Sequence, residues 1–176
     1  MSWAFSDESE RGNLMLFGLL TASTAEVVRA RKELRTLLMP GQRRVHTAKE
    51  SPRRRRRLLD AVGGLDVVAI VFRLRRPAGM HRIAARELLL IAACAVLEPN
   101  EITNWVLDDE EPVQAMRDRR AIDRAIGDRT GFSYDHRPSH DEPLWWAVDA
   151  IVWAVGAGLP MYDRVHHLVE FVEVDP

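Results

Sequence analysis

The pattern of apolar and polar positions predicts two strands at the start of the chain. Residues 3–7 alternate between two faces, and Asp7 ends the face that carries the aromatic side chains. Residues 10–13 have the composition of a turn, and residues 14–21 form a nearly continuous apolar run that is typical of a buried strand. We therefore expect these two strands to form a β-hairpin.

The rest of the chain alternates between helical and extended patterns. A Ser23–Glu26 capping box and the pair Ser51-Pro52 mark the starts of the first two helices. Helices are predicted over residues 23–38, 51–64, 79–97, 112–127 and 144–155, and strands over 65–74, 101–111, 131–135 and 165–174, with a short extended piece at 43–49. Strands that alternate with helices after a hairpin predict an α/β fold, with helices on both faces of a mixed sheet.

Composition narrows the class of protein. The 176 residues are 47% hydrophobic and 29% charged, which fits one globular domain over residues 1–176. A single cysteine, Cys94, excludes an internal disulfide and a cysteine-rich zinc site. The apolar stretch 143–160 is short for a bilayer and carries Asp149 near its centre, and the chain starts with an acidic cluster rather than a signal peptide. We expect a soluble, cytoplasmic protein with no membrane contact.

Charge is divided unevenly along the chain, although the net charge is only −1. Residues 1–98 carry a net charge of +8 and residues 99–176 a net charge of −9. Arginine forks suit phosphate oxygens, so the arginine-rich region predicts contacts with a nucleic-acid backbone, DNA or RNA. The alternatives are pairing with the acidic half of the chain and a surface for a protein partner. The candidate nucleic-acid contacts are Arg43, Arg44, Arg53, Arg54, Arg56 and Arg57.

Several carboxylates lie where a hydrophobic core does not need them. Asp7 ends the first strand, and Asp108 and Asp109 follow the apolar run ITNWVL of another strand. Asp149 lies in LWWAVDAIVWAV, where a buried, unpaired carboxylate would cost several kcal/mol. The alternatives are polar strand ends for the first three, and a bond to a tryptophan N–H or a backbone group for Asp149.

Glu50 and His46 lie in VHTAKE, at the junction between the short extended piece and a helix. Taken alone, each has an ordinary interpretation: a favourable charge at a helix N-terminus for Glu50, and a partly buried surface residue for His46. Together with the other carboxylates, they predict a site for a pair of divalent cations, Mg²⁺ or Mn²⁺. Two such ions activate water and stabilise the leaving oxygen in phosphodiester cleavage.

The order of these motifs resembles the DUF-3800 family, an uncharacterised group in the RNase H-like superfamily. The similar segments are AFSDES at the start, VHTAKE before the arginine-rich helix, WVLDDEE after a strand, and EPLWWAVDAIVWAVGAG near the end. The resemblance implies an RNase H-like mixed β-sheet with an opening hairpin and helices on both faces. It also implies a metal-dependent nuclease-type site.

Carried over residue by residue, the resemblance places metal ligands at Asp7, Asp149 and Asp108, with Asp109 as a rival to Asp108. Family members often carry a glutamate just before the histidine motif, where this chain has Arg43-Arg44-Val45, so Glu50 must substitute or His46 must act as a ligand. A mobile histidine that helps to release product in such enzymes corresponds to His136 or His140.

These expectations lead to one main hypothesis and two alternatives. The main hypothesis is a divalent-metal-dependent nuclease or nuclease-like phosphodiesterase. The alternatives are a non-catalytic adaptor that binds nucleic acid or a protein through its arginine-rich face, and a PIN-like nuclease, whose sheet should be all parallel. The tryptophans of residues 144–155 should pack in the core, and poor packing there would indicate a homodimer interface.

Overall fold

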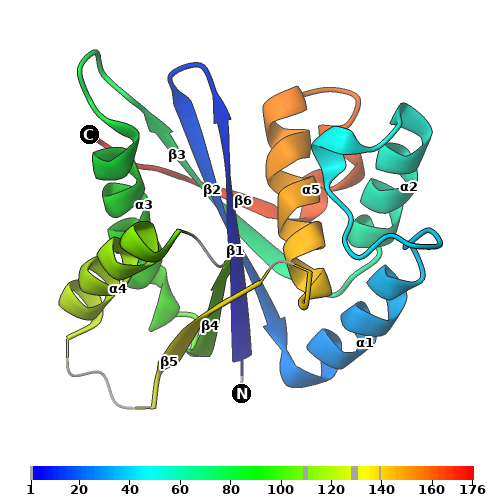
Figure 1. Cartoon of the computed structure of the whole chain (residues 1–176), viewed down its shortest axis with the longest axis horizontal. Helices are drawn as coiled ribbons and strands as arrows, with labels where there is room; N and C mark the ends of the chain where they lie inside the picture. Colours follow the sequence, from blue (N-terminus) through cyan, green and yellow to red (C-terminus); the bar gives the residue numbers. More distant parts are fainter. Residues whose placement is uncertain (1, 109–110, 128–130, 139) are drawn as a thin grey trace.

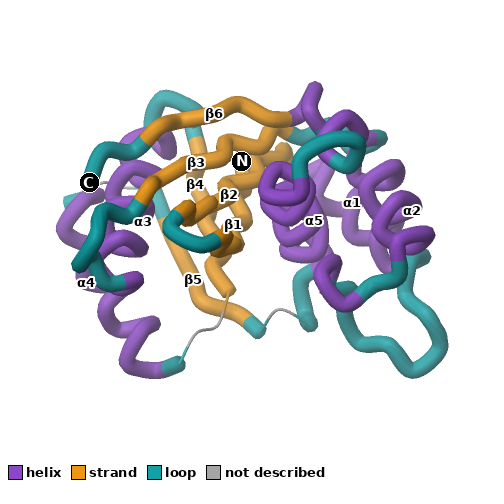
Figure 2. Tube along the Cα trace, turned by 90° about the horizontal axis from the view of Figure 1, so that it is seen from above, coloured by secondary structure: helices purple, strands orange, loops and turns teal. Residues whose placement is uncertain are grey.

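The computed structural model describes residues 2–108, 111–127, 131–138 and 140–176. A six-stranded sheet lies between two groups of helices (Figures 1 and 2). The strands are β1 (Ser2–Arg11), β2 (Leu14–Ser23), β3 (Val68–Arg75), β4 (Ile102–Asp108), β5 (Ser133–Arg137) and β6 (Val169–Glu173). The helices are α1 (Thr24–Arg35), α2 (Pro52–Gly63), α3 (Arg82–Leu97), α4 (Pro112–Ile126) and α5 (Pro143–Ala157), with 3₁₀ turns at Thr47–Lys49, Tyr162–Arg164 and His166–Leu168.

The sheet is mixed, with strand order β5-β4-β1-β2-β3-β6. The expected hairpin joins β1 to β2 through a turn in which Gly12 has a φ of 62°, and β2 pairs antiparallel with β3. The pairs β1–β4, β4–β5 and β3–β6 are parallel. The antiparallel pairs do not fit the all-parallel sheet expected of a PIN-like nuclease.

Alternation along the strands builds a separate hydrophobic core on each face of the sheet. Phe5 and Val106 point toward α1, α2 and α5, which cover one face. Phe17 and Trp105 point toward α3 and α4 on the other face, where their ring centroids lie 6.4 Å apart. The prediction of helices on both faces of a mixed sheet is therefore confirmed.

Helix α5 is the most buried helix of its face, because nearly all of its side chains are apolar. Trp145 and Trp146 are each only 2% exposed, so the prediction that they pack in the core is confirmed. Trp153 is partly buried and lies under the guanidinium of Arg55, 4.8 Å from the ring centroid. No helix in the described ranges is both long and apolar enough to cross a membrane.

Two local predictions differ from the structure. Ser23 caps α1 by accepting from the Glu26 N–H at 3.2 Å, but the Glu26 carboxylate accepts from the Asp66 N–H at 3.1 Å. Only half of the capping box therefore forms. Residues 43–49 form a loop and a 3₁₀ turn rather than an extended piece, and no sheet strand pairs with them.

Candidate acidic site between β1, β4 and α5

Three carboxylates from three different elements line one pocket of about 200 Å³. Ser6 of β1 pairs in parallel with Leu107 of β4, so Asp7 and Asp108 follow as neighbours on the face that α5 covers. Asp149 projects from α5 into the same pocket. The prediction that Asp7 ends the first strand is wrong, because β1 continues to Arg11; Asp108 does end β4. The fold nevertheless brings these two aspartates together with the one aspartate of the apolar helix.

Asp7 lies in an environment that disfavours its charged form. Burial, followed by the negative charges of Asp149 and Asp108, raises the pKa of the Asp7 carboxyl well above its ordinary value. His46 and Arg86 act in the opposite direction, and the Glu8 N–H donates to Asp7 Oδ1 at 2.8 Å. These favourable contacts do not cancel the repulsion among the three carboxylates. A cation in the pocket would relieve it.

Asp149 is held by the loop that precedes α2. Its Oδ2 accepts from the Thr47 N–H at 2.7 Å, and its Oδ1 lies 3.5 Å from His46 Nδ1. The hydrogen bond to Asp149 raises the pKa of His46, against the opposing effect of burial. His46 lies at the rim of the pocket with 41% of its side chain exposed, so it is placed to contact whatever enters there.

Glu50 does not line this pocket, in contrast to the expectation that it completes the acidic set. Its carboxylate is buried, pairs with Arg54 and accepts from Gln42 Nε2 at 2.7 Å. Arg54 also donates to the Leu37 carbonyl at 2.9 Å. Glu50 therefore fastens the loop between α1 and α2, because a salt bridge one helical turn apart already satisfies its charge.

The two candidate histidines, His136 and His140, do not line the pocket. Asp109 lies outside the described residues. His140 is in the loop before α5, 3.4 Å from Asp141, and is not among the residues that line the pocket. His136 belongs to β5 and is buried against Asp118, with Nε2 3.8 Å from the carboxylate. Neither histidine is placed as the mobile residue that the resemblance implied.

Glu8 lines the pocket, although sequence reasoning did not select it. Because it follows Asp7, its side chain points to the other face of the sheet, where α3 supplies Arg82 and Arg86 as partners. Arg86 Nη1 lies 2.6 Å from Glu8 Oε2, and the same guanidinium forms a bidentate pair with Asp118 of α4. The alternation of Asp7 and Glu8 was the available signal that both faces of β1 carry an acid.

Asp118, the buried carboxylate that binds Arg86, is ionised at neutral pH. Burial alone would raise the pKa of Asp118, but the nearby His136 ring and the hydrogen bonds from Arg86 and Gln114 lower it to about 2. Asp118 is only 1% exposed, so its charge depends on these partners. The Asp118–Arg86–Glu8 contacts thereby join α4, α3 and β1 behind the acidic pocket.

The arginine-rich region serves two different purposes. Arg54 binds Glu50, and Arg55 donates to the carbonyls of Thr47 and Ala48 at 2.9 and 2.7 Å, so both hold the loop in place. Arg44 lines the acidic pocket. The remaining candidates are exposed on the surface: Arg43, Arg53, Arg56 and Arg57.

Pairs between the basic and acidic halves of the chain account for part of the charge asymmetry. Arg31 Nε lies 3.1 Å from both carboxylate oxygens of Glu142, which caps α5, and Arg73 pairs with Glu173. The Arg86–Asp118 pair joins the same two halves. Some arginines therefore form salt bridges within the chain, as one of the alternatives predicted, whatever the exposed arginines bind.

The donor chemistry of the pocket suits a divalent cation with oxygen ligands, since Asp7, Asp108 and Asp149 line it. Glu8, the fourth acid of the lining, already pairs with Arg82 and Arg86. Within the described ranges, however, no three or more His, Cys, Asp or Glu side chains are grouped closely enough to hold an ion. An ion in this pocket would have to draw the three carboxylates closer together.

The sheet order, the opening hairpin and the helices on both faces define an RNase H-like fold. The structure is similar to that solved for the PCNA:RNase HII complex from Archaeoglobus fulgidus, with a TM-score of 0.60 and 17% sequence identity over 95% of this chain and 75% of that chain. No protein-family model and no curated protein matches the sequence. The likeness therefore establishes the fold, while the narrower DUF-3800 resemblance rests on the motifs alone.

Proposed function

We propose that this chain is a divalent-metal-dependent nuclease-type phosphodiesterase, with Asp7, Asp108 and Asp149 as its central carboxylates. One observation carries the proposal: Asp7, inside strand β1, faces two further carboxylates in the same pocket, and burial together with their charges raises its pKa. Functional sites are where such perturbations concentrate. The RNase H-like fold and the DUF-3800 motifs support the same function. Membership of the DUF-3800 family is part of this proposal.

Mg²⁺ or Mn²⁺ is the cofactor that fits these residues best. As in the main hypothesis, two such ions would bind. A bound ion of this kind would activate water and stabilise the leaving oxygen of a phosphodiester. Asp7, Asp108 and Asp149 would hold it, and His46 would act as an accessory ligand or orient Asp149 through their contact. Glu50 is left out of the proposed set because Arg54 and Gln42 already bind its carboxylate.

Nucleic acid is the proposed substrate, since a phosphodiester at the pocket would lie beside exposed guanidinium groups. Arg44 lines the pocket itself, and Arg43 precedes it in the same loop. Arg53, Arg56 and Arg57 are exposed on α2, which follows that loop. These five arginines are the proposed phosphate contacts, because a guanidinium fork matches phosphate oxygens. Arg54 is excluded by its contacts with Glu50 and Leu37.

A non-catalytic adaptor that binds nucleic acid or a protein is the second candidate. It is favoured by one observation, that the acids of the described residues are not already grouped closely enough to hold an ion. An adaptor would keep the arginine surface and the fold, and would bind oligonucleotides without cleaving them.

Cleavage assays on short fluorescent oligonucleotides test the proposal directly. Single-stranded DNA, single-stranded RNA, duplex DNA and an RNA–DNA hybrid would each be incubated with Mn²⁺, with Mg²⁺ or with EDTA. We expect metal-dependent cleavage that Asp7→Asn abolishes. Asp141→Asn is the matched control, because Asp141 is 64% exposed and does not line the pocket. Cleavage that survives Asp7→Asn would refute the site, and binding without cleavage of any substrate would favour the adaptor.

A further inference from the structure

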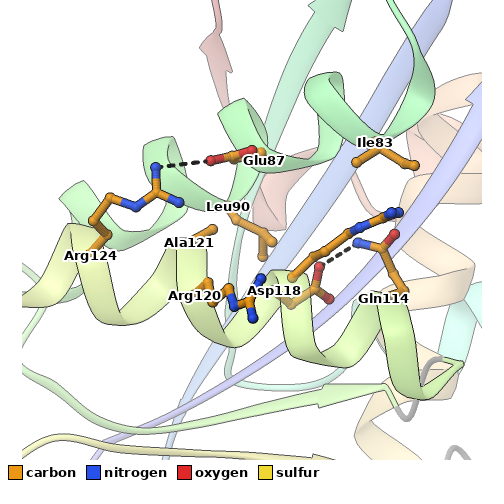
Figure 3. Close-up of a pocket in the computed structure, with 9 residues that line it drawn as sticks. Ile83, Glu87, Leu90, Gln114, Asp118, Arg120, Ala121 and Arg124 are labelled. Atoms are coloured by element: carbon orange, nitrogen blue, oxygen red, sulfur yellow. Dashed lines mark hydrogen bonds and ion pairs between the residues drawn. The ribbon is translucent and has the colours of Figure 1, made fainter.

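A groove between α3 and α4 lies on the face of the sheet opposite the acidic pocket (Figures 1 and 3). Its volume is about 210 Å³. Ile83 and Leu90 of α3 and Ala121 of α4 give it an apolar lining. The groove shares no lining residue with the acidic pocket, so an occupant of one would leave the other open.

Three arginines of α4 form a basic edge along this groove. Arg117, Arg120 and Arg124 follow one another at spacings of three and four residues, which places them on one side of the helix over roughly 10 Å. Arg124 lies 3.4 Å from Glu87, but both side chains are well exposed, so this pair is weak. Within the described ranges, Arg117 and Arg120 form no ion pair. The buried Asp118 does not offset them, because Arg86 neutralises it.

Exposed apolar side chains gather on the same two helices. Nine large hydrophobic side chains are exposed among the described residues, and four of them belong to α3 and α4. These four are Ile83, Ile91, Val113 and Met116, each between 42% and 47% exposed. Such a concentration next to a groove is typical of a surface that a partner covers.

We propose that the α3–α4 groove is a docking site for an acidic amphipathic helix of a protein partner. Carboxylates at helical spacing on that segment would pair with Arg117, Arg120 and Arg124, and its apolar side chains would cover Ile83 and Ala121 in the groove. A nucleic-acid backbone satisfies the arginines but offers no apolar face for the exposed side chains, since its contacts are chiefly to phosphate. The combination of basic edge and apolar lining therefore selects a peptide. This inference is independent of any metal or catalytic role.

A peptide-display selection tests the class of partner without presupposing its sequence. The full-length chain would be used to select from a library of random helical peptides. We expect the enriched peptides to combine leucine-like residues at helical spacing with several Asp or Glu residues, and to lose affinity as salt is raised. A selection that enriches nothing, or enriches peptides without acidic residues, would overturn the proposal.

Variants then locate the binding surface. We expect Arg117→Glu/Arg120→Glu to weaken binding of the selected peptides by about tenfold or more, because interface arginines are frequent hot spots. Ile83→Glu should weaken it as well. Arg53→Glu/Arg56→Glu is the matched control, since it reverses two exposed arginines on α2, away from the groove. All these side chains are exposed, so thermal unfolding should confirm that each variant folds.

A fluorescent single-stranded oligonucleotide supplies the competing outcome. If the α3–α4 groove binds peptides, Arg117→Glu/Arg120→Glu should leave oligonucleotide affinity largely unchanged. Loss of oligonucleotide binding in that variant, with peptide binding retained, would assign α4 to a nucleic-acid surface and overturn the proposal. Equal loss of peptide binding in the α2 control would show that the peptides respond only to overall charge, which would also overturn it.

Discussion

Gly18 lies directly across the β1–β2 ladder from Asp7, and a Cβ atom at Gly18 would lie only 2.6 Å from Val152 Cγ1 of α5. The same atom would lie 2.9 Å from Val148 Cγ1. Asp149 follows Val148 in the helix, so the distance between α5 and β2 also sets the distance between Asp149 and Asp7 of β1. The missing side chain at Gly18 therefore allows the acidic pocket to form.

Gly18→Ala should destabilise the protein, because the added methyl group must push α5 away from the sheet. We expect the free energy of unfolding to fall by about 1–3 kcal/mol, as for other overpacked cores. Gly64→Ala is the matched control, since Gly64 has a φ of −86° and a Cβ there meets only ordinary contacts. Chemical denaturation of both variants checks the prediction, and equal stabilities would show that α5 is not limited by this contact.

The raised pKa of Asp7 predicts how stability depends on pH. The folded state binds a proton at Asp7 more tightly than the unfolded state, where the carboxyl has the ordinary aspartate pKa of 3.8. Stability from this group is complete below that value and is lost as the pH rises through the raised folded pKa. Asp7→Asn should therefore raise the melting temperature near neutral pH in EDTA, with the gain shrinking toward pH ~4. A gain that is constant with pH would contradict the assigned cause.

The hairpin and the misplaced aspartates were predictable from local sequence, because each depends on residues close in the chain. Alternation identified β1, the continuous apolar run identified β2, and Asp149 stood out in a helix that is otherwise apolar. The convergence of Asp7 and Asp108 was predicted by placing both at strand ends, but only Asp108 ends its strand; the two meet because β4 pairs with β1 up to Ser6 while β1 continues to Arg11.

The remaining site features depend on partners that sequence spacing does not reveal. Glu50 looked like a ligand because of its place near His46, but its binding to Gln42 depends on how the loop before α2 folds back. Arg86 reaches both Glu8 and Asp118 across three elements. His136 was expected in a loop, whereas strand β5 buries it beside Asp118. Each of these depends on long-range packing.

Glu50→Gln should separate structural from metal-binding roles. The substitution leaves Arg54 without its charged partner in a mostly buried position, so we expect a loss of roughly 1.5–3 kcal/mol in the free energy of unfolding. Any rise in melting temperature caused by Mn²⁺ should be the same as in the wild type, because Glu50 does not line the acidic pocket. Differential scanning fluorimetry with and without Mn²⁺ measures both effects. Loss of the metal response in Glu50→Gln alone would return Glu50 to the site.

Metal binding should relieve the repulsion that the acidic pocket imposes on the folded state. A ligand present at about 100 times its Kd stabilises a fold by about 2.7 kcal/mol, so saturating Mn²⁺ or Mg²⁺ should raise the melting temperature of the wild type measurably. Asp149→Asn should remove much of this gain, since it deletes one of the three charges that face the pocket.

The same variant should be at least as stable as the wild type without metal. Asparagine keeps an oxygen that accepts from the Thr47 N–H, while the charge that raises the pKa of Asp7 is gone. Asp141→Asn, in an exposed loop, should respond to metal as the wild type does. A wild-type protein that does not respond to either ion would favour the adaptor, and an unchanged response in Asp149→Asn would remove Asp149 from the proposed site.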